Sequence, residues 1–264
     1  MSIERKRNLL RISREISRNP NYVPPSNYGS YELKENNKEE VFNPPMYSGK
    51  RIKTTIKSSY LGHNLNPDYI GKFKGETFIV AGCGSSINLF EDFSKYYIVG
   101  VNDIERILTP DFLVVVNDIK TFMRGRWDYI RDSQSPVIFT HLDKPGPITR
   151  AGNIAKIKIG KRGEPNLDNF NAVDHTMNSP YMAAIIAYQM GAKKIGMVGV
   201  DFSQNHFFSE TGTHKLSKHL KNIDLEYSSL RNELEKRGVK VANLSPISLL
   251  ESWPKMTLEQ FDSL

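Results

Sequence analysis

The chain has 264 residues, of which 39% are hydrophobic and 25% charged, with a formal net charge of +7. This composition excludes disordered, collagen-like and coiled-coil chains, and no apolar run approaches the roughly 18 residues of a membrane-spanning helix. The only cysteine, Cys83, leaves no partner for a disulfide within the chain and fits a reducing, cytoplasmic compartment.

Much of the positive charge falls in the first 75 residues, which we interpret as a basic N-terminal helix followed by an extended arm. Residues 1–18 predict an amphipathic helix, and its six basic and two acidic residues give it a charge of +4. Residues 19–75 are rich in Asn, Pro and Tyr, and we expect them to wrap the main domain. The positive charge favours an anionic partner, either nucleotide phosphates, nucleic acid or a membrane surface, although a solvated face remains an alternative. The residues expected to contact an acceptor or polyanion are Arg7, Arg11, Arg14, Lys50, Arg51 and Lys215.

From Thr77 onward, predicted strands and helices alternate to the end of the chain. The predicted strands are 77–81, 97–101, 112–116, 137–140, 195–200 and 239–242. The predicted helices are 87–94, 118–131, 179–190, 217–237 and a short one at the C-terminus. Several of the strands are apolar along their whole length, which is typical of parallel strands buried on both faces. The pattern therefore predicts an α/β fold with a doubly wound, mostly parallel, Rossmann-like sheet in one catalytic domain, 76–264.

Polar and small residues follow the predicted strands, where ligands bind in such sheets. They are Gly82, Cys83, Gly84 and Ser85 after the first strand, Asn102 after the second, Asn117 after the third, and Asp201, Phe202 and Ser203 after the fifth. Glycines let a phosphate approach the backbone, and asparagine offers a donor and an acceptor to a base edge or ribose. A structural turn at the glycines and helix capping by the Asn and Asp residues remain open as alternatives.

Common cofactor and metal motifs do not occur in the sequence. The glycine-rich segment lacks the third glycine of a dinucleotide fingerprint and the lysine of a Walker loop. There is also no Asp-x-Asp, no His-Glu-x-x-His and no Gly-x-Ser-x-Gly, so we expect neither a metal nor a bound cofactor. Among the six histidines, an imidazole placed near this site would suit proton removal from an alcohol.

Several segments occur in an order found in one enzyme family. They are 81–87 (AGCGSSI), 101–103 (VND), 116–117 (VN), 178–184 (NSPYMAA), 191–202 (GAKKIGMVGVDF), 219–224 (HLKNID) and 245–250 (SPISLL). Together they resemble the ordered motifs of the bacterial glycosyltransferase family 42 sialyltransferases, over about 77–250. Residues 1–75 have no counterpart in that family.

The resemblance implies a GT-A-variant, sialyltransferase-like fold and a metal-independent, inverting transfer of a sugar from a nucleotide sugar to an acceptor hydroxyl. It implies that His219 is the general base, worth roughly 10²–10⁴ in rate, and that Asn102 and Asn117 hold the nucleotide. The other donor-pocket residues it implies are Gly82, Cys83, Gly84, Ser85, Asn178, Ser179, Asp201, Phe202 and Ser203.

Three departures from the family pattern concern the donor. Cys83 stands where the family has asparagine, Ser203 stands where it has a phosphate-binding tyrosine, and the second such tyrosine falls near 208–209, a Phe-Ser pair. The two lost tyrosines suggest a different donor, such as a diphosphate sugar met by His206 or Lys215.

The acceptor and two other functions stay open on sequence grounds. A glycan acceptor is slightly favoured, and the alternative is a hydroxymethylated base in DNA, as in viruses and phages, in which case the chain would act in the host cytoplasm. A magnesium-dependent pyrophosphokinase would use Asp103, Asp118 and Asp201, because similar glycine-rich openings occur in an archaeal family making pterin diphosphates. A non-catalytic binding protein would use His219 only as part of a basic face over 214–221. A peripheral location at a membrane is a further alternative to the cytoplasm. The oligomeric state is also open.

Overall fold

The computed structural model describes residues 69–90, 92–122, 125–142, 153–203, 205–206, 209–210 and 216–264. The predicted helix over 1–18 and the basic residues Arg7, Arg11, Arg14, Lys50, Arg51 and Lys215 lie outside these ranges. No helix within them is both long and apolar enough to cross a bilayer.

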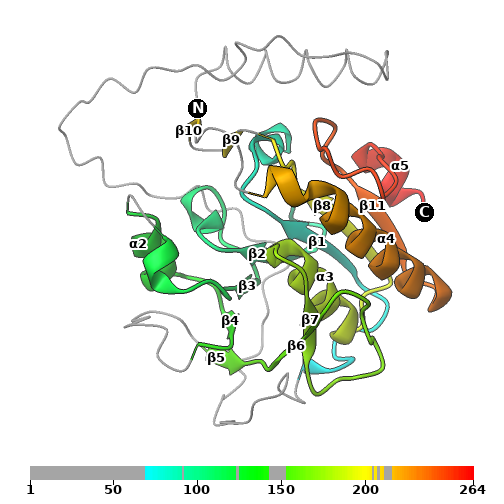
Figure 1. Ribbon diagram of the computed structural model, residues 1–264, viewed down its shortest axis with the longest axis horizontal. Helices are drawn as coiled ribbons and strands as arrows, with labels where there is room; N and C mark the ends of the chain where they lie inside the picture. The colour runs from blue at the N-terminus through cyan, green and yellow to red at the C-terminus, as the bar shows by residue number, and fades with distance from the viewer. Residues whose placement is uncertain are drawn as a thin grey trace.

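The fold is built on one seven-stranded parallel sheet, flanked by helices (Figure 1). Its strands are β1 (Thr77–Ala81), β2 (Tyr97–Val101), β3 (Phe112–Val114), β4 (Val137–Thr140), β5 (Asn153–Lys156), β8 (Lys194–Val198) and β11 (Lys240–Asn243). The α-helices are α2 (Arg126–Arg131), α3 (Ser179–Gln189), α4 (Leu220–Lys236) and α5 (Leu258–Asp262). Short 3₁₀ helices are η2 (Ser85–Leu89), η3 (Ile104–Arg106), η4 (Ile119–Thr121) and η5 (Ser217–His219). Two small two-stranded sheets pair β6 (Ile159–Arg162) with β7 (Val173–His175) and β9 (Asn205–His206) with β10 (Ser209–Glu210).

The strand order β11-β8-β1-β2-β3-β4-β5 makes the sheet doubly wound. The chain moves outward from β1 to β5, then returns to the other side of β1 with β8 and continues to β11. Every pairing within this sheet is parallel, with Val80 opposite Val99 on one side and Met197 on the other. The predicted fold class is confirmed, and the order reverses between β1 and β8.

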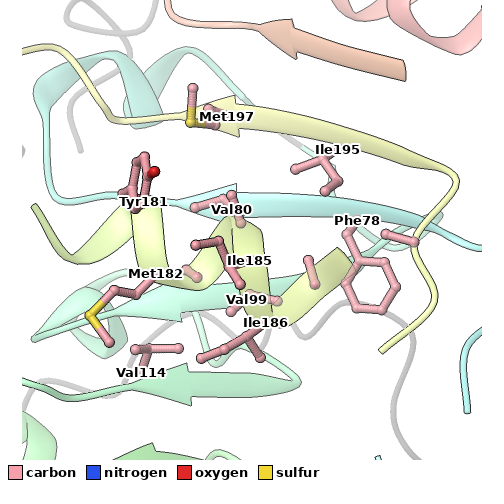
Figure 2. Close-up of a cluster of buried hydrophobic side chains, with 14 of the residues drawn as sticks. Phe78, Val80, Val99, Val114, Tyr181, Met182, Ile185, Ile186, Ile195 and Met197 are labelled. Carbon is pink, nitrogen blue, oxygen red and sulfur yellow. The ribbon is translucent and has the colours of Figure 1, made fainter. Parts of the chain in front are cut away.

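Both faces of the sheet are buried, as the continuously apolar strands predict. Val80, Val99 and Val114 point toward α3, where Ile185 and Ile186 pack against them (Figure 2). Ile79, Ile98 and Leu113 belong to a separate cluster on the other face, with residues of η2, η3, α2 and α5. The alternation along each strand divides the apolar residues between two layers of helices.

Helix α4 owes its position to a single apolar stripe. Ile223, Tyr227, Leu230 and Leu234 recur at helical spacing and are fully buried, while Leu225 lies on the opposite side and is 63% exposed. Because α4 lies between β8 and β11 in the chain and these two strands are parallel, the helix runs antiparallel to them. It therefore begins beside their carboxyl ends. That placement brings the start of α4 to the edge where ligands bind in such sheets.

The structure corrects the predicted elements between 85 and 157. The predicted helix over 118–131 is the 3₁₀ turn η4 and the short helix α2, which begins after Gly125 in the left-handed conformation (φ 71°). The predicted helical stretch after Ser86 is the short helix η2, and the strand predicted over 112–116 ends at Val114. Strand β5 falls where the prediction has a loop, because its four residues carry no long apolar run.

Residues 69–75, at the end of the segment assigned to the arm, pack into the core. Tyr69 is fully buried, and its ring lies edge-on to Phe112 and Phe139. The backbone amides of Gly71 and Phe73 donate to the carbonyls of Gln189 and Met190 at the end of α3. The folded domain thus includes these residues before β1.

Replacing Ile186 with alanine should lower the free energy of unfolding by about 2–5 kcal/mol, because the cavity would lie between α3 and the sheet. Leu225→Ala is the matched control, since this exposed position should change stability by no more than about 0.5 kcal/mol. Urea denaturation followed by circular dichroism measures both. Equal losses in the two variants would contradict the assigned core.

Candidate functional site

The candidate site lies at the carboxyl ends of β1, β2, β3 and β8, which we call the carboxyl edge. Helices α3 and α4 both begin at this edge, because each precedes a strand that runs parallel to β1. In Figure 2, Tyr181 and Met182 of α3 lie toward the strand arrowheads, whereas Phe78 lies at the opposite end. The topology therefore brings six chain segments to one edge of the sheet.

The loops after β1 and β8 are in direct backbone contact. A Cβ atom on Gly82 would lie 2.4 Å from the Gly199 carbonyl oxygen, and one on Gly199 would lie 2.3 Å from the Gly82 carbonyl oxygen. The Gly82 amide donates to Val198 and the Gly84 amide to Gly199, at 2.8 and 2.7 Å. These glycines are required by the packing of one loop on another, whether or not a ligand also approaches them.

The carboxylate of Asp201 holds the same two loops together from inside. It accepts hydrogen bonds from the Ser86 amide (2.8 Å) and the Ser86 hydroxyl (2.5 Å), with the Ser85 hydroxyl 3.5 Å away. A Cβ on Gly84 would lie 2.5 Å from this carboxylate, so only glycine fits there. Asp201 is 2% exposed, and burial raises the pKa of its carboxyl group despite the hydrogen bonds that oppose the rise. Its side chain is thus engaged in the interior.

Cys83 is also directed inward, beneath the end of β2. Its thiol lies 3.4 Å from the Val101 carbonyl oxygen and 3.7 Å from Asp103, and burial raises its pKa well above the ordinary value. Asp103 has a fully buried side chain and binds the Arg126 guanidinium through two hydrogen bonds, of 2.9 and 2.5 Å. The Arg126 side chain keeps 20% of its surface exposed. This cluster ties α2 to the ends of β1 and β2.

Asn102 and Asn117 meet at the carboxyl edge. The Asn117 side-chain amide donates to the Asn102 side-chain oxygen at 3.2 Å, which joins the ends of β2 and β3. Asn102 has a left-handed backbone (φ 55°), a conformation that is uncommon outside glycine. Asn117 is exposed and Asn102 half-buried, so the amide pair borders solvent.

Helix capping accounts for Asp118 but not for the preceding residue, Asn117. The Asp118 carboxylate accepts from the Lys120 amide at 3.0 Å, as expected at the start of the η4 turn. The Asn117 amide instead turns toward Asn102. The two asparagines are therefore the part of this edge that local structure does not account for.

Asn178 and His219 lie immediately before the two helices that begin at this edge. Asn178 stands at the N-cap of α3, and its side-chain oxygen accepts from the Tyr227 hydroxyl at 2.6 Å. His219 stands at the N-cap of α4, is half-buried, and donates its backbone amide to Leu216 at 2.8 Å. Both side chains thus belong to helix starts that reach the edge from the α3 face of the sheet.

The end of β8 combines a strained backbone with an unsatisfied hydroxyl. Phe202 has a left-handed backbone (φ 53°) and packs against Tyr227, with 6.5 Å between ring centroids. The next residue, Ser203, has a buried hydroxyl oxygen without a hydrogen-bond partner among the described residues. The side chain of His206 and the whole of Lys215, predicted as phosphate contacts, lie outside what the structure describes.

The aspartates proposed for a magnesium-dependent pyrophosphokinase are not gathered into a metal site. Asp103 is paired with Arg126, Asp201 with Ser86, and Asp118 caps a turn. Across the described ranges, no group of three His, Cys, Asp or Glu side chains could hold a metal ion. That alternative has no support in this geometry.

Sequence patterns did not single out Arg126 or Tyr227, although both contact predicted site residues or their neighbours. Arg126 belongs to no recognisable sequence motif, and Tyr227 occupies a position typical of the core stripe of α4. The only available signal for Tyr227 is a polar aromatic on an otherwise aliphatic stripe, since a buried tyrosine hydroxyl usually requires a partner.

Comparison with solved structures finds the sialyltransferase CstII in several complexes. CstII in complex with a trisaccharide acceptor and CMP is 14% identical, over 70% of this chain and 88% of that chain, with a TM-score of 0.42. CstII from Campylobacter jejuni, in complex with cytidine-5'-monophosphate, is 14% identical over 69% and 85%, with a TM-score of 0.39. No protein-family model and no curated protein matches the chain. At this level of similarity, function has to be inferred from the residues of the carboxyl edge.

Replacing Asp201 with asparagine should lower the free energy of unfolding near neutral pH by about 1–3 kcal/mol, because an N–H₂ group would replace one of the two oxygens that accept from Ser86. The raised pKa of Asp201 means that the folded state binds the proton more tightly than the unfolded state, whose value is near 3.8. Its contribution to stability is therefore complete below that value and declines as the pH rises.

The difference in unfolding free energy between the wild type and Asp201→Asn should accordingly shrink as the pH is raised above about 3.8. Urea titrations at a series of pH values from 3 to 8 measure this difference, and groups common to both proteins cancel. A difference that grows with pH would contradict the assigned direction.

Proposed function

We propose that this protein is a glycosyltransferase that binds a nucleotide sugar at the carboxyl edge and transfers the sugar to an acceptor hydroxyl. The observation that carries the proposal is the hydrogen-bonded pair of Asn102 and Asn117 at the ends of β2 and β3. The order of the sequence motifs, which resembles the family 42 sialyltransferases, supports the same reaction class.

The amide pair suits a nucleoside because each asparagine keeps part of its hydrogen-bonding capacity. Since the Asn117 nitrogen donates to the Asn102 oxygen, the Asn102 nitrogen and the Asn117 oxygen are the groups left to face a ligand. A donor beside an acceptor complements a base edge or a ribose diol. The left-handed backbone of Asn102 is the kind of local strain that persists where the surrounding structure fixes a functional side chain.

His219 is proposed as the general base on the acceptor. Helix α4 begins at the carboxyl edge, where β8 and β3 lie three positions apart in the sheet, about 14 Å at the usual strand spacing. The imidazole would take the proton of the acceptor hydroxyl as its oxygen attacks the anomeric carbon. The bond from that carbon to the nucleotide phosphate would break on the opposite face, the phosphate leaving with the electron pair, and configuration would invert.

We propose a glycan as the acceptor and a nucleotide diphosphate sugar as the donor. The donor follows from Ser203, which stands where the sialyltransferase pattern has a phosphate-binding tyrosine. A hydroxyl too short to replace a phenol leaves the phosphate to cationic groups, and the partly exposed Arg126, which binds Asp103 at the end of β2, is a candidate for this contact.

The proposal is tested by incubating the protein with a panel of cytidine-, uridine- and guanosine-linked sugars and following slow hydrolysis by mass spectrometry. We expect one nucleotide class to be hydrolysed faster than the protein-free control. If no donor is hydrolysed and none binds, the transferase assignment is wrong.

His219→Ala should reduce the hydrolysis or transfer rate at least about a hundredfold, equivalent to about 2.7 kcal/mol of activation free energy. Lys221→Ala, two residues further along the same basic segment and exposed, is the control and should keep the rate. An equal loss in both variants, or none in His219→Ala, would support a binding protein with a basic face.

Asn102→Ala and Asn117→Ala should each weaken nucleotide binding about tenfold, as expected for one hydrogen bond to a ligand. Because the two amides bond to each other, the double variant should lose less than the sum of the single losses in binding free energy. Isothermal titration calorimetry of the four proteins gives this coupling. Strict additivity would mean that the amides do not act as a unit.

A further inference from the structure

Asn178 occupies a helix N-cap without capping the helix. An asparagine in this position usually accepts a hydrogen bond from an amide of the first turn through its side-chain oxygen. The Asn178 side chain makes no such bond within the described residues, and its oxygen instead accepts from the Tyr227 hydroxyl at 2.6 Å. Tyr227, a residue of α4, therefore determines the orientation of the Asn178 amide.

This bond fixes which atom of the Asn178 amide is available at the edge. A tyrosine hydroxyl donates and the amide oxygen accepts, so the oxygen is directed to Tyr227 and the two N–H groups remain for another partner. Asn178 is only half-buried, which leaves the amide accessible. The neighbouring Ser179 is 7% exposed, and its hydroxyl is a second group that can donate a hydrogen bond. Two side chains with donor groups are thus adjacent at the start of α3.

Tyr227 itself is held firmly enough to act as a support. It is fully buried, packs edge-on against Tyr181 with 5.2 Å between ring centroids, and accepts the Trp253 indole N–H at its carbonyl at 3.0 Å. The preceding residue, Glu226, bonds the Thr176 hydroxyl and the Arg162 guanidinium. Two consecutive residues of α4 therefore fix the segment that leads into α3.

We propose that Tyr227 is a positioning residue that turns the Asn178 amide so that its N–H groups, together with the Ser179 hydroxyl, bind an anionic or carbonyl oxygen of the nucleotide sugar. This role rests on the proposed function. Without the Tyr227 hydroxyl, the Asn178 oxygen is free to rotate back and cap α3. The amide would then no longer present its N–H groups to the ligand. The stability of the fold would change little, because the cap replaces the lost hydrogen bond.

The chain offers a matched control for this role in Tyr181. Its ring is as fully buried as that of Tyr227 and belongs to the same aromatic cluster, but its hydroxyl donates to the Gly163 carbonyl at 3.1 Å, away from Asn178. Tyr181→Phe and Tyr227→Phe each delete one buried hydroxyl. Only the second should affect the amide of Asn178.

The experiment measures binding of CMP, UDP and GDP to the full chain by isothermal titration calorimetry, alongside melting temperatures. Tyr227→Phe should weaken binding of the nucleotide, or of its sugar conjugate, on the order of tenfold, and Tyr181→Phe should leave it unchanged. The melting temperature should fall no further in Tyr227→Phe than in Tyr181→Phe, because a cap replaces the lost bond. In Asn178→Ala, the additional change Tyr227→Phe should have no further effect on binding.

The outcomes separate this inference from the proposed function. If Asn102→Ala weakens binding but Tyr227→Phe behaves like Tyr181→Phe, the positioning role is wrong and the function stands. The same holds if Asn178→Ala leaves binding intact, or if the Tyr227→Phe effect persists in Asn178→Ala. If none of the nucleotides or their sugar conjugates binds the wild type, the proposed function fails, and the positioning role with it.

Discussion

The arrangement of the carboxyl edge depends on one buried carboxylate. Asp201 follows β8, and its oxygens accept from the amide and hydroxyl of Ser86, which follows β1. The Ser86 hydroxyl in turn lies 2.8 Å from that of Ser245, beyond β11, and accepts from the Gly199 amide. Since β1 and β8 are the strands between which the sheet reverses its order, this network fixes the place where the two halves of the fold meet. The polar groups at the edge are arranged around it.

The polar residues of the carboxyl edge divide into those that hold the edge together and those that face outward. Cys83, Asp103 and Asp201 direct their side chains into the interior, where hydrogen bonds satisfy them. The amides of Asn102 and Asn178 reach the surface from the sheet and from α3, and each is oriented by a single partner. Interior hydrogen bonds therefore preorganise the edge, which lowers the entropic cost of ordering its side chains when a ligand binds.

Sequence alone was sufficient for the architecture and insufficient for the division just described. The ends of β1, β2 and β4 match the prediction, because continuous apolar runs bounded by polar residues leave little choice of element. Strand β5 was missed because its pairing with β4 comes from the long-range register and not from its own four residues. Periodicity also placed Asp201 and Asn102 at equivalent strand ends. Only coordinates separate them, since side-chain direction depends on the left-handed backbone of Asn102 and the burial of Asp201.

The position of β1 inside the sheet, between β8 and β2, has a consequence for how the protein is made. Its two neighbours are β2, which follows within twenty residues or so, and β8, more than 100 residues later in the chain. During synthesis, one side of β1 is therefore without its partner until most of the domain has left the ribosome. Nonlocal parallel pairing of this kind slows folding and exposes apolar strands to aggregation. We therefore expect folding during expression to depend on chaperones, with the unpaired side of β1 as the segment prone to aggregation.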